Sequence, residues 1–250
     1  MRRTTVALTR YAPTPSGFLH AGNIANLERT AKVAREVGAT VALRIDDADA
    51  ARYRRTYVDD IFRVLEERHL TWSVGPRDTD DFEAHFSQRA KTEYYRAELL
   101  ASGLDTYACG CSRAVQREIP TGGCQGACRD AGLSFVPGET ALRVLVPVGT
   151  AIDVAGTTVP LDEVMGDFVV WRRDDLPAYQ WVSVIEDRDL GTTHIVRGTD
   201  LLASSAAQVF LAGAVGADNV VSADYIHHEL VVDDEGRKLS KSTLAAMEDR

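Results

Sequence analysis

The fold is decided by residues 4–45, TTVALTRYAPTPSGFLHAGNIANLERTAKVAREVGATVALRI. Residues 4–9 form a short apolar run that predicts a buried strand, and residues 40–45 predict a second one. Between them, a loop rich in glycine and proline leads into apolar residues at helical spacing, which end at the stop signal Gly38. This order of strand, helix and strand predicts a right-handed βαβ unit with parallel strands.

The rest of the chain continues the alternation, with one interruption. Helices are expected over 58–65, from about 82 to 100 and over 201–213, and strands over 141–147, 150–156, 168–171, 192–196 and 226–232. The β-rich segment 106–165 interrupts the pattern. We therefore predict an α/β protein with a Rossmann-like parallel sheet formed by residues 1–105 and 166–250, and a small inserted subdomain over 106–165.

Composition excludes several classes of protein. The 250 residues are 45% hydrophobic and 26% charged, as in an ordinary globular protein. No apolar run approaches the roughly 18 residues of a membrane span, and the apolar stretch before Arg10 is too short for a signal peptide. We expect a cytoplasmic protein without a membrane partner. The net charge of −9 argues against a broad basic surface, so any RNA contact would use a local basic patch.

All four cysteines lie within 20 residues, in the pattern C-x-C-x12-C-x3-C: Cys109, Cys111, Cys124 and Cys128. Two close pairs separated by a turning loop are typical of a tetrahedral zinc site. Four thiolates leave no open position for water, so the predicted zinc is structural. Unligated cysteines are the alternative, and disulfides are disfavoured in a cytosolic chain of this size.

Two loops are candidates for phosphate binding. His20-Ala21-Gly22-Asn23 leads into a helix, whose N-terminal N–H groups attract anions, and Gly22 permits close approach of a ligand to the backbone. Lys238-Leu239-Ser240-Lys241 follows a glycine-containing acidic turn, and its two lysines could reach a polyphosphate. Taken singly, each stretch is more typical of an ordinary loop: a loop histidine with a turn glycine in the first case, and a solvated basic loop in the second.

Together the two loops resemble the HIGH and KMSKS signatures of class I aminoacyl-tRNA synthetases. The stretches RYAPTPSGFLHAGN, LRIDDADAAR, YACGCSR, GDFVVWRRDDLPAYQWVSVIEDRDLGTTHIVRGTDLL and HHELVVDDEGRKLSKS resemble the glutamyl/glutaminyl branch, in that family's order and over nearly the whole chain. The resemblance is closest to its short members, the glutamyl-queuosine tRNA(Asp) synthetases. Only nine residues follow Lys241, so we expect no anticodon-binding domain.

The resemblance implies a ligase that activates an acidic amino acid with ATP and releases pyrophosphate, with Mg²⁺ on the phosphates and a structural Zn²⁺. The implied catalytic residues are His20, Lys241 and Lys238, and the implied ATP-binding residues are His20, Gly22, Asn23, Lys238, Ser240 and Lys241. The amino-acid pocket is expected at Arg10, Thr14, Asp46, Tyr179, Ser183 and Arg197. Two arginines in a small pocket favour an anionic side chain such as that of glutamate. As alternatives from the residues alone, Arg44 and Arg197 could pair with Asp47, Asp49 or Asp200.

The pocket departs from the family pattern at two positions. Asp46 stands where the glutamyl enzymes usually have a glutamate that contacts the amino group, and Ser183 replaces an asparagine or an apolar residue. A change of one methylene is worth roughly 1–3 kcal/mol of discrimination. The expected acceptor is queuosine in tRNA(Asp), and the expected assembly is a monomer. The alternatives are transfer to a small molecule, peptide or carrier protein, and a non-catalytic binding paralogue.

Overall fold

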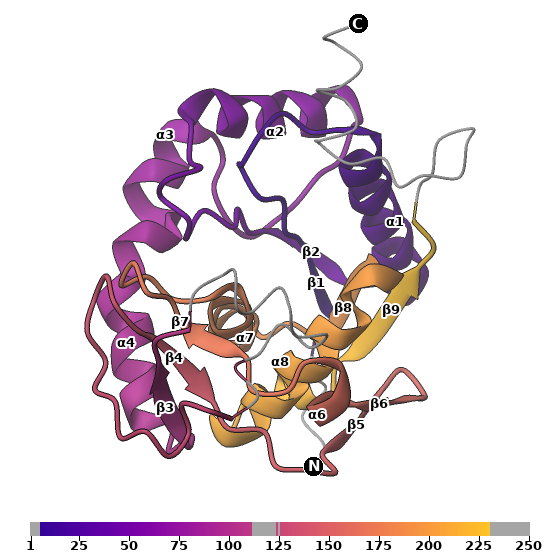
Figure 1. Cartoon of the computed structure of the whole chain (residues 1–250). Coiled ribbons are helices and arrows are strands. Elements are labelled where there is room, and N and C mark those ends of the chain that lie inside the picture. The colour runs from indigo at the N-terminus through magenta and orange to yellow at the C-terminus, as the bar shows by residue number, and fades with distance from the viewer. Residues whose placement is uncertain (1–5, 112–123, 125, 231–250) are drawn as a thin grey trace, which may run out of the picture. The chain divides into compact units, whose positions relative to one another are not determined.

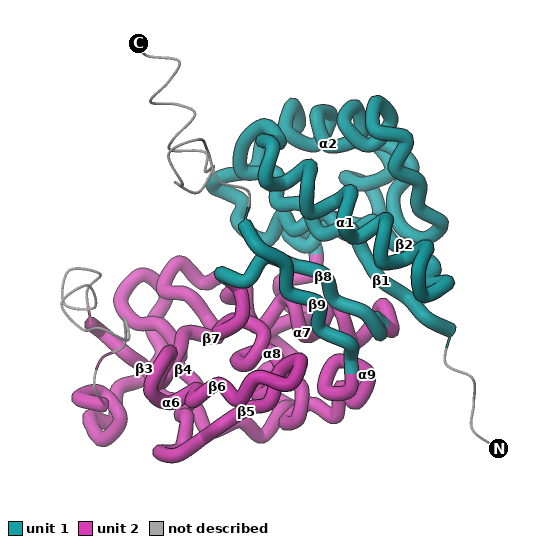
Figure 2. Tube along the Cα trace, turned by 90° about the vertical axis from the view of Figure 1, so that its right-hand side faces the viewer, with its two compact units in different colours: residues 1–90, 192–200, 223–250 teal, residues 91–191, 201–222 magenta. Residues whose placement is uncertain are grey.

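The computed structural model describes residues 6–111, 124 and 126–230, and these belong to two compact units (Figure 2). Unit 1 comprises residues 1–90, 192–200 and 223–250, and unit 2 comprises residues 91–191 and 201–222. Within the described ranges, no helix combines the length and the apolar character that a membrane span requires.

Unit 1 is built around two pairs of parallel strands (Figure 1). The Thr193 N–H group donates to the Leu8 carbonyl at 2.9 Å, which connects the two pairs in the order β2-β1-β8-β9. The strands are β1 (Leu8–Tyr11), β2 (Thr40–Leu43), β8 (His194–Gly198) and β9 (Asp224–His228). The parallel βαβ unit expected from residues 4–45 is confirmed by this pairing.

The first strand lies later in the chain than expected. β1 covers Leu8–Tyr11 rather than residues 4–9, of which residues 4 and 5 lie outside the described part of the chain. The register with β2 runs from the pair Leu8 and Thr40 to the pair Tyr11 and Leu43. Arg10 is therefore a strand residue and not a loop residue, and its side chain is buried.

Helix α1 (Ala21–Val37) connects β1 to β2 and packs on the core of unit 1. Leu27, Ala31 and Ala34 form its buried face, and Leu27 and Ala31 join a hydrophobic cluster with Tyr11. Burying one leucine side chain is worth roughly 1.5–3 kcal/mol. The helix ends at Gly38, whose φ of 67° is left-handed, so the stop signal identified in the sequence is confirmed.

The helix expected from about residue 82 to 100 is broken at Ser87, so that prediction is wrong. The segment contains α3 (Thr79–Asp81), a π-helical turn (Phe82–Phe86), a 3₁₀ turn (Gln88–Lys91) and α4 (Thr92–Ala101). Ser87 has extended backbone, with φ −61° and ψ 125°. The Ser87 hydroxyl and the Gln88 N–H group donate to the Asp47 carboxylate at 2.6 and 2.7 Å, and these bonds compensate for the interrupted helix. The helix α2 (Arg55–Glu67) appears as expected.

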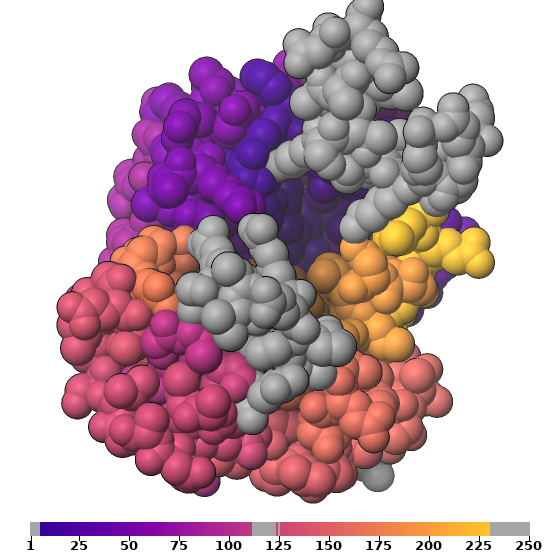
Figure 3. Space-filling model, viewed as in Figure 1, coloured from indigo at the N-terminus to yellow at the C-terminus, as the bar shows by residue number. Residues whose placement is uncertain are grey.

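Unit 2 contains a three-stranded antiparallel sheet of order β3-β4-β7 and a β5-β6 hairpin. The hairpin turns at Ala155 and Gly156, which both have positive φ, as a two-residue loop requires. Its outer face lies at the molecular surface (Figure 3). The elements are β3 (Thr106–Cys109), β4 (Ala141–Val144), β5 (Ala151–Val154), β6 (Thr157–Pro160), α6 (Leu161–Val164), β7 (Val169–Trp171), α7 (Tyr179–Leu190), α8 (Leu202–Ala214) and α9 (Asp218–Val221).

The inserted segment shares a sheet with residues that follow it. β3 and β4 lie within the predicted subdomain 106–165, whereas β7 lies after it and pairs with β4. The compact units also divide the chain at different residues from the predicted domains. Because a compact unit is not the same as an independently folding domain, the boundaries at 106 and 165 stay a prediction.

Candidate active site and cysteine centre

The loop after β1 ends in a capping box at the start of α1. His20 is the N-cap residue, and its Nδ1 accepts the Gly22 N–H at 3.1 Å. The His20 N–H donates in return to Asn23 Oδ1 at 3.3 Å. With Nδ1 acting as an acceptor, the proton of the neutral imidazole lies on Nε2. The ring can therefore donate to an anion at the positive end of the helix.

This loop is held by a carboxylate that the sequence analysis missed. The Leu19 N–H donates to Asp60 Oδ2 at 2.8 Å, and Arg63 donates to Asp60 Oδ1 at 2.6 Å. Asp60 lies on the buried side of α2 together with Val58 and Ile61. The sequence did contain a signal for Asp60, because it is an acidic residue on an otherwise apolar helix face.

Arg10 and Arg197 are both 3% exposed and lie on β1 and β8, strands that the Thr193–Leu8 hydrogen bond connects. The Arg197 guanidinium carbon lies 6.0 Å from the centre of the Tyr225 ring. Each arginine is the last residue but one of its strand. Because the two strands are parallel, both arginines lie at the carboxyl edge of the sheet. Ligands of open α/β sheets bind at this edge, and buried guanidinium groups there favour an anionic ligand.

Thr14 and Asp46 follow neighbouring strands. The Asp46 N–H donates to the Pro13 carbonyl at 2.9 Å, so the segments after β1 and β2 stay paired beyond the sheet. The exposed Thr14 directly follows Pro13, the residue to which Asp46 donates. Both residues therefore belong to the same edge of unit 1 as Arg10.

The Asp46 carboxylate is held by two side chains. Arg44 donates from Nε to Oδ1 at 2.7 Å and from Nη2 to Oδ2 at 3.1 Å. Gln88 Nε2 donates to the same Oδ1 at 2.8 Å. Arg44 thus pairs with Asp46, a partner that the sequence analysis did not name. Gln88 had no signal in the sequence, because it approaches Asp46 from 42 positions away.

Tyr179 and Ser183 belong to unit 2, where they lie one turn apart on α7. Tyr179 is 44% exposed, whereas Ser183 is 1% exposed. The Ser183 hydroxyl oxygen has no hydrogen-bond partner among the described residues. A buried hydroxyl without a partner is costly and is typical of a site that receives a ligand. Lys238, Ser240 and Lys241 lie outside the described residues.

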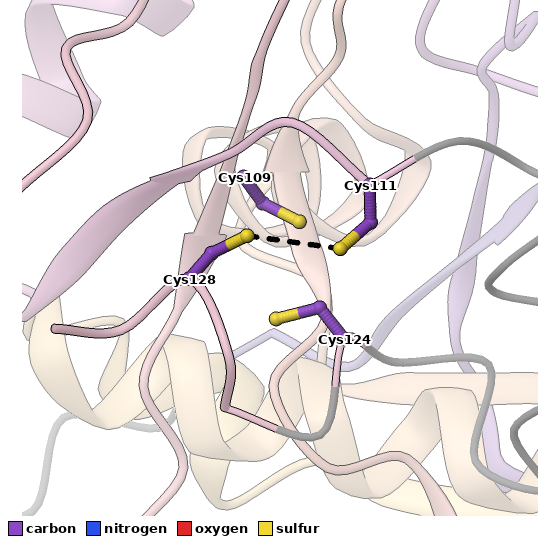
Figure 4. Close-up of side chains that lie close together, drawn as sticks. All are labelled: Cys109, Cys111, Cys124 and Cys128. Carbon is purple, nitrogen blue, oxygen red and sulfur yellow. Dashed lines mark hydrogen bonds between the residues drawn. The ribbon is translucent and has the colours of Figure 1, made fainter. Parts of the chain in front are cut away.

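The four cysteine sulfurs converge at the end of β3 (Figure 4). None of the four cysteines, all within the described part of the chain, forms a disulfide, and their sulfurs lie within 4.8 Å of one another. The sulfurs of Cys111 and Cys128 are 3.6 Å apart. A tetrahedral zinc ion with Zn–S bonds of about 2.3 Å separates its sulfurs by about 3.8 Å. The four thiols fit a structural zinc ion, and their spacing does not fit disulfides.

A network of hydrogen bonds surrounds the cysteine cluster. The Tyr107 hydroxyl lies 3.3 Å from Cys124 Sγ and donates to Asp167 at 2.8 Å. Arg129, next to Cys128, donates to both Asp167 oxygens at 2.5 and 2.7 Å. The Val146 N–H donates to Asp167 at 2.8 Å. Such partners fix the orientation of metal ligands. The sequence analysis did not identify Tyr107, Asp167 or Arg129.

The thiols differ in acidity. Burial alone would raise the pKa of Cys124, but the contact with the Tyr107 hydroxyl and the hydrogen bonds from the Cys128 and Gly126 N–H groups lower the pKa to about 7. Burial and the neighbouring thiols raise the pKa of Cys111 to about 12. Without a cation the cluster cannot ionise fully, because adjacent thiolates repel one another. A metal ion that binds here must therefore displace protons.

A family model described as tRNA synthetases class I (E and Q), catalytic domain, matches residues 6–119 and 133–250. A protein named glutamyl-Q tRNA(Asp) synthetase from Methylococcus capsulatus is 37% identical over 240 residues, which cover 93% of this chain and 74% of that one. One of the same name from Burkholderia orbicola is 34% identical and covers 96% of this chain and 82% of its own.

Solved structures show the same fold. A glutamate tRNA ligase from Elizabethkingia meningosepticum, in complex with its amino acid, superposes with a TM-score of 0.75 at 23% identity. The match covers 95% of this chain and 52% of that one, so the chain spans about half the length of the solved structure. A glutamate-tRNA synthetase from Elizabethkingia anophelis gives a TM-score of 0.74 at 22% identity and covers 96% of this chain and 54% of its own. The chain therefore belongs to the class I tRNA synthetases of the E and Q type and is a ligase.

Proposed function

We propose that the protein activates glutamate with ATP and transfers the glutamyl group to queuosine in tRNA(Asp). The observation that carries this proposal is the 37% identity to a protein named glutamyl-Q tRNA(Asp) synthetase over 93% of the chain. The buried arginines Arg10 and Arg197 support an acidic substrate, because a buried positive charge is stabilised by a carboxylate partner.

In the proposed first step, a carboxylate oxygen of the amino acid attacks the α-phosphorus of ATP, and the bond to pyrophosphate breaks. His20 Nε2–H and the N-terminus of α1, with Gly22 and Asn23, would stabilise the negative charge on the phosphate oxygens. Lys238, Ser240 and Lys241 are proposed to bind the same phosphates. The ATP phosphates would hold Mg²⁺, which keeps few protein ligands in such sites.

The proposed amino-acid pocket assigns one task to each group. Arg10 and Arg197 would bind the side-chain carboxylate of glutamate, and Asp46 would accept from its ammonium group. Thr14, Tyr179 and Ser183 would complete the pocket. In the second step an acceptor hydroxyl attacks the carbonyl carbon of the adenylate, and AMP leaves.

The cysteine cluster would have a structural role. Zinc held by four thiolates has no open position and supplies cross-linking rather than reaction chemistry. We propose residues 106–165 as a subdomain that carries this zinc and contributes to acceptor binding. Residues 1–105 and 166–250 would form the catalytic domain, and the protein would act as a monomer.

Amino-acid-dependent exchange between ATP and pyrophosphate, measured with each of the twenty amino acids and without tRNA, tests the activation step. We expect exchange with glutamate and not with neutral amino acids, because the arginine pocket requires an anion. Exchange that requires another amino acid, or no exchange at all, would contradict the assignment of the pocket.

Transfer of radioactive glutamate tests the acceptor. We expect transfer to tRNA(Asp) that contains queuosine, and none to the same tRNA carrying an unmodified guanine or to tRNA(Glu). If glutamate is activated but none of these RNAs is labelled, the acceptor is a different molecule. The activation step would then stand, and the proposed acceptor would be wrong.

A further inference from the structure

Gln88 has an unusual position for a glutamine. It lies at the start of a 3₁₀ turn in unit 1 and is 1% exposed. Its Nε2 donates to Asp46 Oδ1 at 2.8 Å, whereas its Oε1 is buried and has no hydrogen-bond partner among the described residues. A buried acceptor without a partner costs about 1–3 kcal/mol. An apolar side chain of similar size would avoid that cost.

The position of Gln88 is firmly determined by its neighbours. Its own N–H donates to Asp47 at 2.7 Å, and the adjacent Ser87 and Arg89 side chains donate to the same carboxylate at 2.6 and 2.8 Å. Asp47 follows Asp46 directly. The amide of Gln88 is therefore held beside Asp46 by its own backbone N–H and by its two neighbours, in contacts that do not depend on the Gln88 side chain.

The two carboxylate oxygens of Asp46 accept different numbers of hydrogen bonds. Oδ1 accepts from both Arg44 Nε and Gln88 Nε2, whereas Oδ2, as far as the described residues show, accepts the longer bond from Arg44 Nη2, at 3.1 Å. The side chain is 12% exposed, so the protein does not enclose it completely. Since a carboxylate oxygen can accept more than one hydrogen bond, Oδ2 retains capacity for a donor.

From these contacts we infer that Gln88 completes the amino-group subsite: its Nε2 holds Asp46, and its Oε1 accepts one N–H of the substrate ammonium group. This inference rests on the proposed function. An ammonium group has three N–H donors and can bond Asp46 Oδ2 and Gln88 Oε1 together. The terminal torsion of a glutamine is soft, so a small rotation turns Oε1 toward the incoming group. The amide compensates for the methylene that Asp46 lacks relative to glutamate.

The test compares substrates with and without the amino group. Gln88→Met keeps the volume of the side chain but removes both the donor and the acceptor. Exchange kinetics would give KM for glutamate and KM for ATP, and competition would give Ki for glutarate, which lacks the amino group. We expect KM for glutamate to rise roughly ten- to hundredfold, as loss of a hydrogen bond to a charged group implies. Ki for glutarate and KM for ATP should change less than about twofold.

Gln208→Met is the matched control. Gln208 is also 1% exposed, and its Nε2 donates to Gln180 Oε1 in unit 2. This variant should leave the ratio of glutamate to glutarate affinity unchanged. Equal weakening of glutamate and glutarate by Gln88→Met would mean that Gln88 is only structural, and an unchanged KM for glutamate would also overturn the inference. Failure of the wild type to activate glutamate would instead refute the proposed function.

Discussion

Asp47 and Asp167 are both buried aspartates that anchor segments with functional side chains, but their surroundings differ. Asp47 holds the turn 87–89 of unit 1 to the residues after β2, through Ser87, Gln88 and Arg89. Asp167 holds the loop around Cys128 in unit 2 through Arg129 and Tyr107. The first anchor fixes its segment through hydrogen bonds and an ion pair with Arg89. The loop that Asp167 holds also carries cysteines of the four-thiol cluster, which fits a metal ion.

The difference shows that these two regions depend on different interactions for their order. Around Asp47, removal of the carboxylate leaves the buried Ser87 hydroxyl and Gln88 N–H without their acceptor. Around Asp167, a bound zinc ion would still hold the loop if the carboxylate were removed. We therefore expect one region to respond to substitution of a single aspartate and the other to respond chiefly to removal of metal.

The largest effect is expected from the cysteine cluster. Cys124→Ser should reduce the zinc content from one ion per chain to less than about 0.2, because only three strong ligands remain. The melting temperature of the Cys124→Ser variant should fall by roughly 5–15 °C relative to the wild type, since the binding free energy of a structural metal contributes to folding. Elemental analysis and thermal unfolding measure both quantities. A strong chelator should produce the same fall in the wild type and no further fall in the variant; a wild type without zinc would contradict the prediction.

The second largest effect is expected from Asp47→Ala, which should lower the free energy of unfolding. The change leaves the buried Ser87 hydroxyl and Gln88 N–H without their acceptor, which costs about 1–3 kcal/mol for each group, and it removes an ion pair with the partly exposed Arg89. Chemical denaturation measures the loss. Because no metal is involved, a chelator should not change the difference between variant and wild type. Asp130→Ala, at an exposed aspartate, serves as the control and should stay within about 0.5 kcal/mol. A similarly small loss for Asp47→Ala would show that its segment is held by other contacts.

The smallest effect is a dependence on pH. Burial alone would raise the pKa of Asp167, but hydrogen bonds from Arg129, the Val146 N–H and Tyr107 hold that pKa below its ordinary value. The carboxylate therefore stabilises the fold above about pH 4, its ordinary value, and this contribution is lost as the pH falls through the lower folded pKa. The difference in stability between the wild type and Asp167→Asn should be full at pH 6 and shrink below about pH 4. A difference that stays constant down to pH 3 would show that the charge of Asp167 does not contribute.

Several features were predictable because their determinants are close together in the chain. The βαβ unit follows from apolar runs and from Gly38, and the cysteine cluster follows from four residues in one stretch of 20. The capping role of His20 is also local, since its partners are two and three residues away. The family match agrees with the signatures read from the sequence.

Other features depended on groups that meet only in the folded chain. The helix pattern after residue 82 is interrupted because Asp47, 40 residues earlier, captures the Ser87 hydroxyl. Gln88 reaches Asp46 across 42 residues, and Asp167 reaches Arg129 across 38. The sequence by itself determined most of the elements and the cysteine cluster, since periodicity and short spacing act over a few residues. Only the tertiary structure decided which buried carboxylate satisfies which donor, because that choice depends on distances created by packing.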